Sequence, residues 1–275
     1  MRTTTSFNSR IILAICIIPA LLQSCLSPSI YLSNSTNTPN LTNKNEGNVN
    51  TYIGLSRIEL QGAYSPTRNF GILFNGYSTY NAFDNLANGQ SNNTSSFAEL
   101  AGGFYHPLGS LSNWFFDVYG GYGMGSRTYN GAVDQSGLSG KYPTIVDIYT
   151  SYNKLFIQPT VFYKRQKFEF SLSIQFSELL FNYINVWYFE TYSSYQGHPN
   201  IPPIYSGPQN YVNENFAATF KYGLKRVKLI TQIANTIAPS AVNPSSYFGG
   251  YDGLYFNARP IEINVGIQYS FGHKE

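Results

Sequence analysis

The sequence predicts an all-β chain folded as an antiparallel up-and-down transmembrane β-barrel of about 10 strands, with 8 or 12 as alternatives. Three observations lead to this fold class. Apolar and polar residues alternate through many separate segments, which is the period-two pattern of strands. The 275 residues are 17% aromatic and only 11% charged, against about 25% charged in soluble domains. Short and long connections follow each other in turn, as in outer-membrane barrels.

The clearest segment is the last one, residues 261–271. Its apolar residues recur at every second position without exception, at Ile261, Ile263, Val265, Ile267, Tyr269 and Phe271. A tilted β-strand needs about 9–11 residues to cross a bilayer. This segment is therefore long enough to be a membrane-spanning strand.

The whole-chain averages agree with a barrel. Mean hydropathy is −0.20 and no apolar run after residue 25 is long enough for a spanning helix, which needs about 18 residues or more. Lumen-facing polar residues offset lipid-facing ones in any average over a barrel. The net charge of +3 is too small to indicate nucleic acid as a partner.

The N-terminus has the features of an export signal. Arg2 and Arg10 precede an apolar run over residues 11–22, too short to span a membrane. Leu22-Gln23-Ser24-Cys25 follows directly. We therefore expect a lipoprotein signal peptide over residues 1–24, with an ordinary cleaved signal as the alternative.

The segment after the signal is rich in Ser, Thr, Asn and Pro. Such a composition buries too little apolar surface to offset its ordering entropy. We expect residues 25–48 to be a flexible tether that begins at a lipidated Cys25, and residues 49–275 to form the barrel. Cys16 leaves with the signal, so no thiol pair remains for a disulfide.

The alternating segments place the strands and the turns that join them. Proline has no N–H for the ladder, so Pro159 predicts a β-bulge within its segment. The expected strands cover residues 49–55, 58–65, 70–79, 97–106, 114–127, 155–164, 168–177, 216–222, 227–236 and 261–271.

The connections predict the orientation of the barrel. Short turns lie at Thr67, Pro107, Gln166 and Lys225, and long loops start near Asn81, Asn130, Tyr183 and Pro239. In outer-membrane barrels the short turns are periplasmic and the long loops extracellular. We therefore expect an outer-membrane protein of a Gram-negative bacterium with its N-terminus on the periplasmic side.

Two short motifs carry a resemblance to a known group. Leu22-Gln23-Ser24-Cys25 resembles a lipobox, and the Tyr269-x-Phe271 ending resembles the terminal strand by which outer-membrane barrels are recognised for assembly. Together they resemble lipid-modified outer-membrane β-barrel proteins of the Bacteroidota, although residues 272–275 extend past the usual ending. The resemblance implies outer-membrane lipids, the barrel-assembly machinery and the lipoprotein-export machinery as partners.

No constellation of catalytic residues appears in the sequence. His106, His198 and His273 fall at separate places in the predicted topology, whereas a hydrolase needs a nucleophile, a base and an orienting group together. Asp134, Asp147 and Asp252 lie in different predicted loops without calcium-loop spacing. We expect no enzyme activity, no metal site and no cofactor.

Charged residues on the inward faces form the main candidate site. Buried charges must be paired to avoid a desolvation cost, so a balanced set predicts a network that fills the lumen. The alternative is a narrow polar channel for small solutes. The expected members are Glu59, Glu99, Asp117, Arg127, Lys164, Glu169, Lys221, Lys228, Arg259 and Glu262.

The long loops predict a second candidate site. They are rich in tyrosine, a residue typical of adaptable recognition surfaces. We expect a structural or surface-recognition role with surface ligands or proteins as partners. A further alternative is a soluble, lipid-anchored barrel that binds an apolar ligand, with the apolar faces turned inward. The loop tyrosines are Tyr192, Tyr195, Tyr205, Tyr211, Tyr247, Tyr251 and Tyr255.

Overall fold

The computed structural model describes residues 29–53, 57–79, 92–109, 113–133, 144–190, 204–206, 208–237, 255–257 and 261–272. No helix long and apolar enough to cross a membrane occurs in this part of the chain. The predicted signal peptide and Cys25 lie outside these residues.

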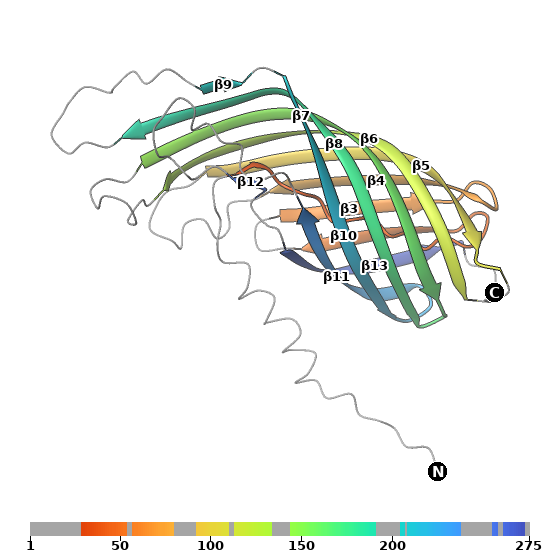
Figure 1. The fold of residues 1–275 in the computed structure, drawn as a ribbon. Coiled ribbons are helices and arrows are strands. Elements are labelled where there is room, and N and C mark those ends of the chain that lie inside the picture. Colours follow the sequence, from red (N-terminus) through yellow and green to blue (C-terminus); the bar gives the residue numbers. More distant parts are fainter. Residues whose placement is uncertain are drawn as a thin grey trace, which may run out of the picture.

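Ten antiparallel strands form one closed barrel (Figure 1). Each barrel strand pairs with the next one along the chain, including β8 with β10, and the last strand β13 pairs with the first strand β2 to close the ring. This confirms the predicted fold class and strand number. The barrel strands are β2 (Gly47–Ile53), β3 (Arg57–Tyr64), β4 (Phe70–Thr79), β5 (Asn92–Pro107), β6 (Trp114–Val133), β7 (Thr144–Lys164), β8 (Phe168–Glu190), β10 (Gln209–Gly223), β11 (Val227–Ile237) and β13 (Ile261–Phe271).

Three short strands lie at one end of the barrel. β9 (Ile204–Ser206) extends the pairing of β8, while β1 (Ser29–Tyr31) and β12 (Tyr255–Asn257) form a separate parallel pair. We call this end the loop end, because the longer connections join the strands there. The opposite end, with the short connections at 65–69, 108–113, 165–167 and 224–226, is the turn end.

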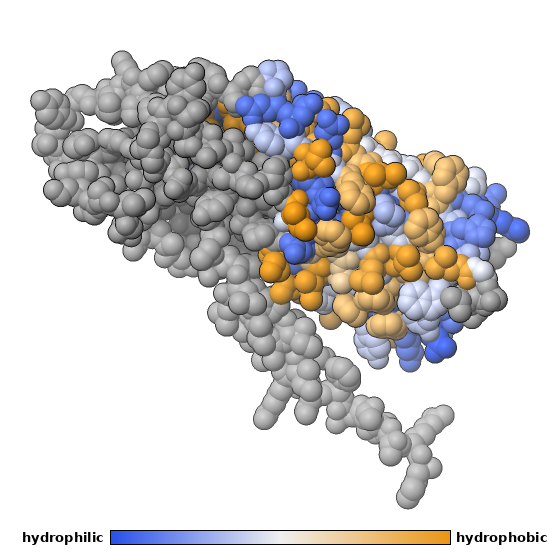
Figure 2. All heavy atoms as spheres, viewed as in Figure 1, coloured by the Kyte–Doolittle hydropathy of each residue, from blue (hydrophilic) through white to orange (hydrophobic). Residues whose placement is uncertain are grey.

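The bulky apolar side chains face outward. Ile53, Phe104 and Met124 are 66%, 69% and 58% exposed, whereas the alternate positions are buried and mostly polar. Figure 2 shows the apolar residues gathered over the barrel wall. An apolar exterior around a polar interior is the arrangement of a barrel embedded in lipid. A soluble barrel with an apolar interior, one of the alternatives, has the opposite sidedness.

The wall is much taller on one side than on the other. β5, β6, β7 and β8 have 16, 20, 21 and 23 residues, whereas β2, β3, β4, β11 and β13 have 7, 8, 10, 11 and 11. The long loop predicted from near Asn130 to the strand at residue 155 was therefore wrong at both ends, since β6 runs to Val133 and β7 begins at Thr144. Adjacent strands satisfy each other's backbone groups, so they continue past the length that the bilayer requires.

The bulge predicted at Pro159 is also misplaced. Pro159 pairs with Val118 of β6, and the register against β8 is the same at Ile157 and Thr160, on either side of the proline. The register shift lies instead between Ser151 and Tyr152. Proline lacks an N–H and so removes one hydrogen-bond donor from the ladder. The strands stay in register past this missing hydrogen bond without the extra residue of a bulge.

The N-terminal segment departs most from the prediction. Ile30, Ser35, Thr36 and Leu41 are all 0% exposed. Residues 30–41 lie inside the barrel, so the prediction of a flexible tether was wrong for this part of residues 25–48. The composition argument counts only the apolar surface of the segment itself. It cannot count hydrogen-bond partners from the strands. We call residues 30–46 the lumen segment.

Candidate functional site

The lumen segment runs along the barrel from the loop end to the turn end. The Ile30 carbonyl accepts a hydrogen bond from Thr150 Oγ1 (3.0 Å), and Leu32 O accepts one from the Tyr77 hydroxyl (2.9 Å). Tyr77 is close to the loop end of β4, which finishes at Thr79. The segment therefore begins in the loop half of the lumen.

Its other end contacts the short turns. Lys164 Nζ, at the last residue of β7, donates to the Asn40 carbonyl (2.7 Å). The Asn45 N–H donates to the Ser65 carbonyl (2.7 Å) beside the β3–β4 turn. After Glu46 the chain reverses and enters β2 at Gly47. The same end of the barrel also contains the last residue of β13.

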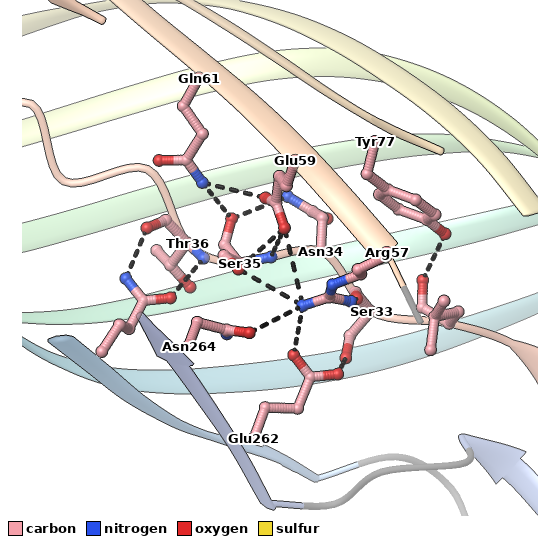
Figure 3. A network of polar contacts seen from close by, with 12 residues as sticks. Ser33, Asn34, Ser35, Thr36, Arg57, Glu59, Gln61, Tyr77, Glu262 and Asn264 are labelled. Carbon is pink, nitrogen blue, oxygen red and sulfur yellow. Dashed lines mark hydrogen bonds and ion pairs between the residues drawn. The ribbon is translucent and has the colours of Figure 1, made fainter. Parts of the chain in front are cut away.

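Arg57 is at the centre of the polar contacts (Figure 3). Its Nη2 lies 2.7 Å from Glu262 Oε2 and 3.6 Å from Glu59 Oε2, and the Arg57 side chain is only 3% exposed. Its Nη1 donates to the Ser33 carbonyl of the lumen segment. The planar guanidinium has five donors, so one side chain bonds β3, β13 and the lumen segment together.

The lumen segment also satisfies the two carboxylates that face Arg57. The Ser33 hydroxyl donates to Glu262 Oε1 (3.0 Å), and the Ser35 hydroxyl donates to Glu59 Oε2 (2.8 Å). A buried carboxylate has about four lone-pair sites to satisfy. Arg57 alone leaves several of them open, and the serine hydroxyls occupy some of these.

A second ion pair joins the opposite wall to the lumen segment. Lys154 Nζ lies 3.0 Å from Glu99 Oε2 and donates to Asn34 Oδ1 (2.8 Å) and Gln175 Oε1 (2.9 Å). The Asn34 amide in turn donates to Glu99 Oε1 (3.1 Å). All three donors of the Lys154 ammonium therefore have acceptors, one of them from the lumen segment.

A third group lies nearer the turn end. Glu169 pairs with Lys228, and its Oε2 is 3.8 Å from Lys221 Nζ. Asn40 Nδ2 donates to the same carboxylate (2.9 Å), and Lys221 donates to the Thr38 carbonyl. This carboxylate and its lysines also bind the lumen segment. We call these three groups, centred on Arg57, Lys154 and Glu169, the charged region.

Aromatic side chains fill the loop half of the lumen. Tyr152 packs against Tyr31 of the lumen segment with ring centroids 5.3 Å apart, against Phe97 at 6.2 Å and against Phe181 at 5.5 Å. Tyr77 stacks on Phe97 at 5.6 Å. These rings belong to one buried apolar core. We call them the aromatic cluster.

The predicted lumen charges mostly lie where the alternation places them. Lys164 is partly buried with its side chain 14% exposed, and Arg259 lies outside the described residues. Seven of the ten enter the ion pairs described here: Glu59, Glu99, Lys164, Glu169, Lys221, Lys228 and Glu262. The buried positions are Glu59, Glu99, Asp117, Arg127, Glu169, Lys221, Lys228 and Glu262.

Three important charges were missed. Arg57 and Lys154 each precede an outward apolar residue, Ile58 and Leu155, so extending the alternation by one position predicts both as inward. The strands expected at residues 58–65 and 155–164 begin one position after each of them. Glu46, which pairs with Lys164, lay in the expected tether. No strand pattern marks it.

The other predicted features are placed as follows. His106 is exposed, while His198 and His273 lie outside the described residues. No group of three metal-ligating side chains occurs among the described residues. Tyr211, expected in a loop, lies in β10 and packs edge-on against Phe181 at 5.7 Å. The side chains of the other loop tyrosines are outside the described part.

Comparisons with known proteins give no family. No protein-family model matches the sequence, and no curated protein matches it. Among solved structures the chain is similar to the KdgM porin, alone and in complex with disordered oligogalacturonate. Each of these has a TM-score of 0.35 and 10% identity, covering 82% of this chain and 99% of the porin.

A second similarity is to the translocator domain of the autotransporter NalP from Neisseria meningitidis. Its TM-score is 0.38, with 10% identity, 82% of this chain covered and 86% of the other. Similarities at this level add nothing to the fold assignment. The closed barrel is established by the strand pairing itself.

Proposed function

We propose that this chain is an outer-membrane β-barrel lipoprotein whose lumen is closed by its own N-terminal segment. In this proposal it acts as a structural or surface-recognition protein through its extracellular loops. The observation that supports it best is the complete burial of residues 30–38 along the lumen axis. A lumen occupied by protein and bonded to every side of the wall has no continuous file of water.

The apolar exterior supports the membrane location. Lipid is the solvent in which outward Leu, Ile and Phe are stable, and an outer-membrane barrel has the strand number and polar interior observed here. Outer-membrane lipids and the barrel-assembly and lipoprotein-export machineries are the partners in this proposal. Acylation of Cys25 belongs to the proposal as well, on the strength of the lipobox-like sequence.

Conductance measurements test the closed lumen. Wild-type protein reconstituted in a planar bilayer should show no steady conductance, because the charged region and the aromatic cluster both fill the interior. A stable open channel in the wild type would overturn the proposal. Slower migration of the boiled than the unboiled protein in a detergent gel verifies that the barrel is closed in the sample.

A narrow channel remains the second candidate. It is favoured by one observation: residues 30–41 of the lumen segment are not part of the barrel sheet, and the hydrogen bonds that join them to the wall use side chains. If the segment leaves, the inward Ser, Thr and Gln residues line a polar path. A variant lacking residues 30–41 that still shows heat-modifiable migration should then conduct. A folded deletion variant without conductance argues against this candidate.

A further inference from the structure

The direction of the lumen segment determines the end of the barrel at which the N-terminus leaves. Ser29 and Tyr31 pair with Tyr255 and Asn257 of β12. β12 lies in the connection between β11 and β13, and this connection is at the loop end. The first described residue is therefore at the loop end, although β2 starts at the turn end.

Sequence distance limits where Cys25 lies. It precedes Ser29 by four residues, and an extended chain covers about 3.3–3.6 Å per residue. Cys25 is thus within about 14 Å of Ser29. To reach the turn end it would have to pass back through the lumen, which the segment and its partners already fill.

At the exit β1 contacts the tall strands β7 and β6 and also pairs with β12. β12 belongs to the connection between two short strands, so one side of the rim is low. β12 is flanked in sequence by β11 and β13, with 11 residues each, against 21 and 23 for β7 and β8. A strand of about 9–11 residues crosses the bilayer without projecting far beyond it. A short stretch of chain therefore suffices to pass from the loop-end mouth over this rim to the lipid surface.

We propose that the N-terminus of the mature chain, with the lipid on Cys25, is held at the cell surface, and that its acyl chains insert into the outer leaflet. This inference rests on the proposed outer-membrane barrel with extracellular loops. It reverses the expected N-terminal location. The barrel strands do begin and end at the turn end, but the preceding segment returns through the lumen to the opposite side.

A cysteine-labelling experiment tests this sidedness. Once the signal is removed, Cys25 is the single cysteine of the chain, and acylation on sulfur leaves no free thiol. Ser27→Cys then supplies a unique thiol beside the anchor. Intact cells are treated with a membrane-impermeant maleimide and compared with permeabilised cells. Wild type treated with the same maleimide measures any thiol remaining on Cys25. A clickable fatty acid reports acylation, which Cys25→Ala should abolish.

Two matched controls calibrate the labelling. Gln196→Cys places a thiol in the connection between β8 and β9 at the loop end and is the control for surface labelling. Gln166→Cys places a thiol in the exposed β7–β8 turn and is the control for the periplasmic side. We expect Ser27→Cys to be labelled on intact cells to the same extent as Gln196→Cys, and Gln166→Cys to be labelled at least tenfold more after permeabilisation. Labelling of Ser27→Cys only after permeabilisation, in parallel with Gln166→Cys, overturns the surface anchor.

The remaining outcomes separate this inference from the proposed function. Loss of heat-modifiable migration in the wild type removes the membrane barrel itself, and the surface anchor with it. If Gln166→Cys is labelled on intact cells and Gln196→Cys is not, the barrel is inverted and the anchor is not on the surface. Absence of the fatty-acid label from wild type removes the lipid from the proposal.

Discussion

Two adjoining regions of the lumen, the charged region and the aromatic cluster, bind the same segment by different means. They meet where Arg57 lies over the Tyr77 ring (5.6 Å) and Lys154 over the Phe97 ring (5.2 Å). In the charged region, Arg57, Lys154 and Glu169 make directed bonds to individual atoms of the segment or its partners. In the aromatic cluster, Tyr31 is held by ring packing around Tyr152. Directed bonds define the register of the segment, because a shift by one residue would remove the hydrogen bonds that it makes to the buried ion pairs of the wall. Ring packing excludes water but tolerates small shifts.

The difference also bears on assembly. Ser33 and Ser35 contribute hydrogen bonds that the Glu262 and Glu59 carboxylates need once they are buried. An empty barrel with these carboxylates in place would therefore be less stable than the filled one. We expect the strands to close around the segment during folding. If the barrel closed first, water would solvate those ion pairs, and the segment would have to displace that water when it entered.

The largest effect is expected in the charged region. Arg57→Leu leaves Glu262 and Glu59 without their cation, and breaking a buried pair costs about 3–5 kcal/mol. The free energy of unfolding, measured by urea titration in detergent micelles, should fall by that amount. Arg165→Leu, at an exposed turn position, is the control and should change little. Equal values for the two variants would contradict the central role of Arg57.

The aromatic cluster should respond nearly as strongly but in a different way. Tyr152→Ala removes a fully buried ring that contacts Tyr31, Phe97 and Phe181, and such truncations cost about 3 kcal/mol. Because the seal is lost while the ion pairs remain, brief conductance events should also appear in planar bilayers. Tyr152→Phe keeps the ring and should stay silent and stable. Conductance in the phenylalanine variant would show that packing is not the seal.

A single hydroxyl of the lumen segment gives a smaller, more local effect. Ser35→Ala removes the donor to Glu59 Oε2, and a hydrogen bond to a charged group contributes about 1.5–3 kcal/mol. The loss should shrink when Glu59→Gln is already present, because the two side chains then no longer share a charged bond. Additive losses in this double-mutant cycle would refute the coupling.

The smallest effect is expected on the outer face. Val265→Leu adds a methylene toward lipid next to the inward Asn264, and the change in unfolding free energy should stay within about 0.5 kcal/mol. Glu262→Leu, in the same strand but facing Arg57, should cost several times more. A severe Val265→Leu with a neutral Glu262→Leu would mean that the faces of the barrel are exchanged.

Alternation along the chain was sufficient to predict the barrel and the direction of most side chains. Glu59 and Glu262 are inward and Ile58 and Ile263 face the other side, because successive residues in a strand point to opposite faces. The same rule, extended by one position, covers Arg57 and Lys154. The lengths of β6, β7 and β8 were not predictable in this way, since strands above the bilayer are stabilised by pairing with each other.

Only the tertiary structure decided the fate of residues 30–46. By composition they resemble a solvated linker, and nothing local distinguishes Ser33 or Asn34 from any other polar residue. Their partners come from strands far along the chain, such as Glu262, 229 positions from Ser33. A polar segment becomes ordered when a cavity supplies a matching acceptor or donor for most of its groups. The sequence alone determined the barrel and its inward charges, and the closed barrel determined what fills it.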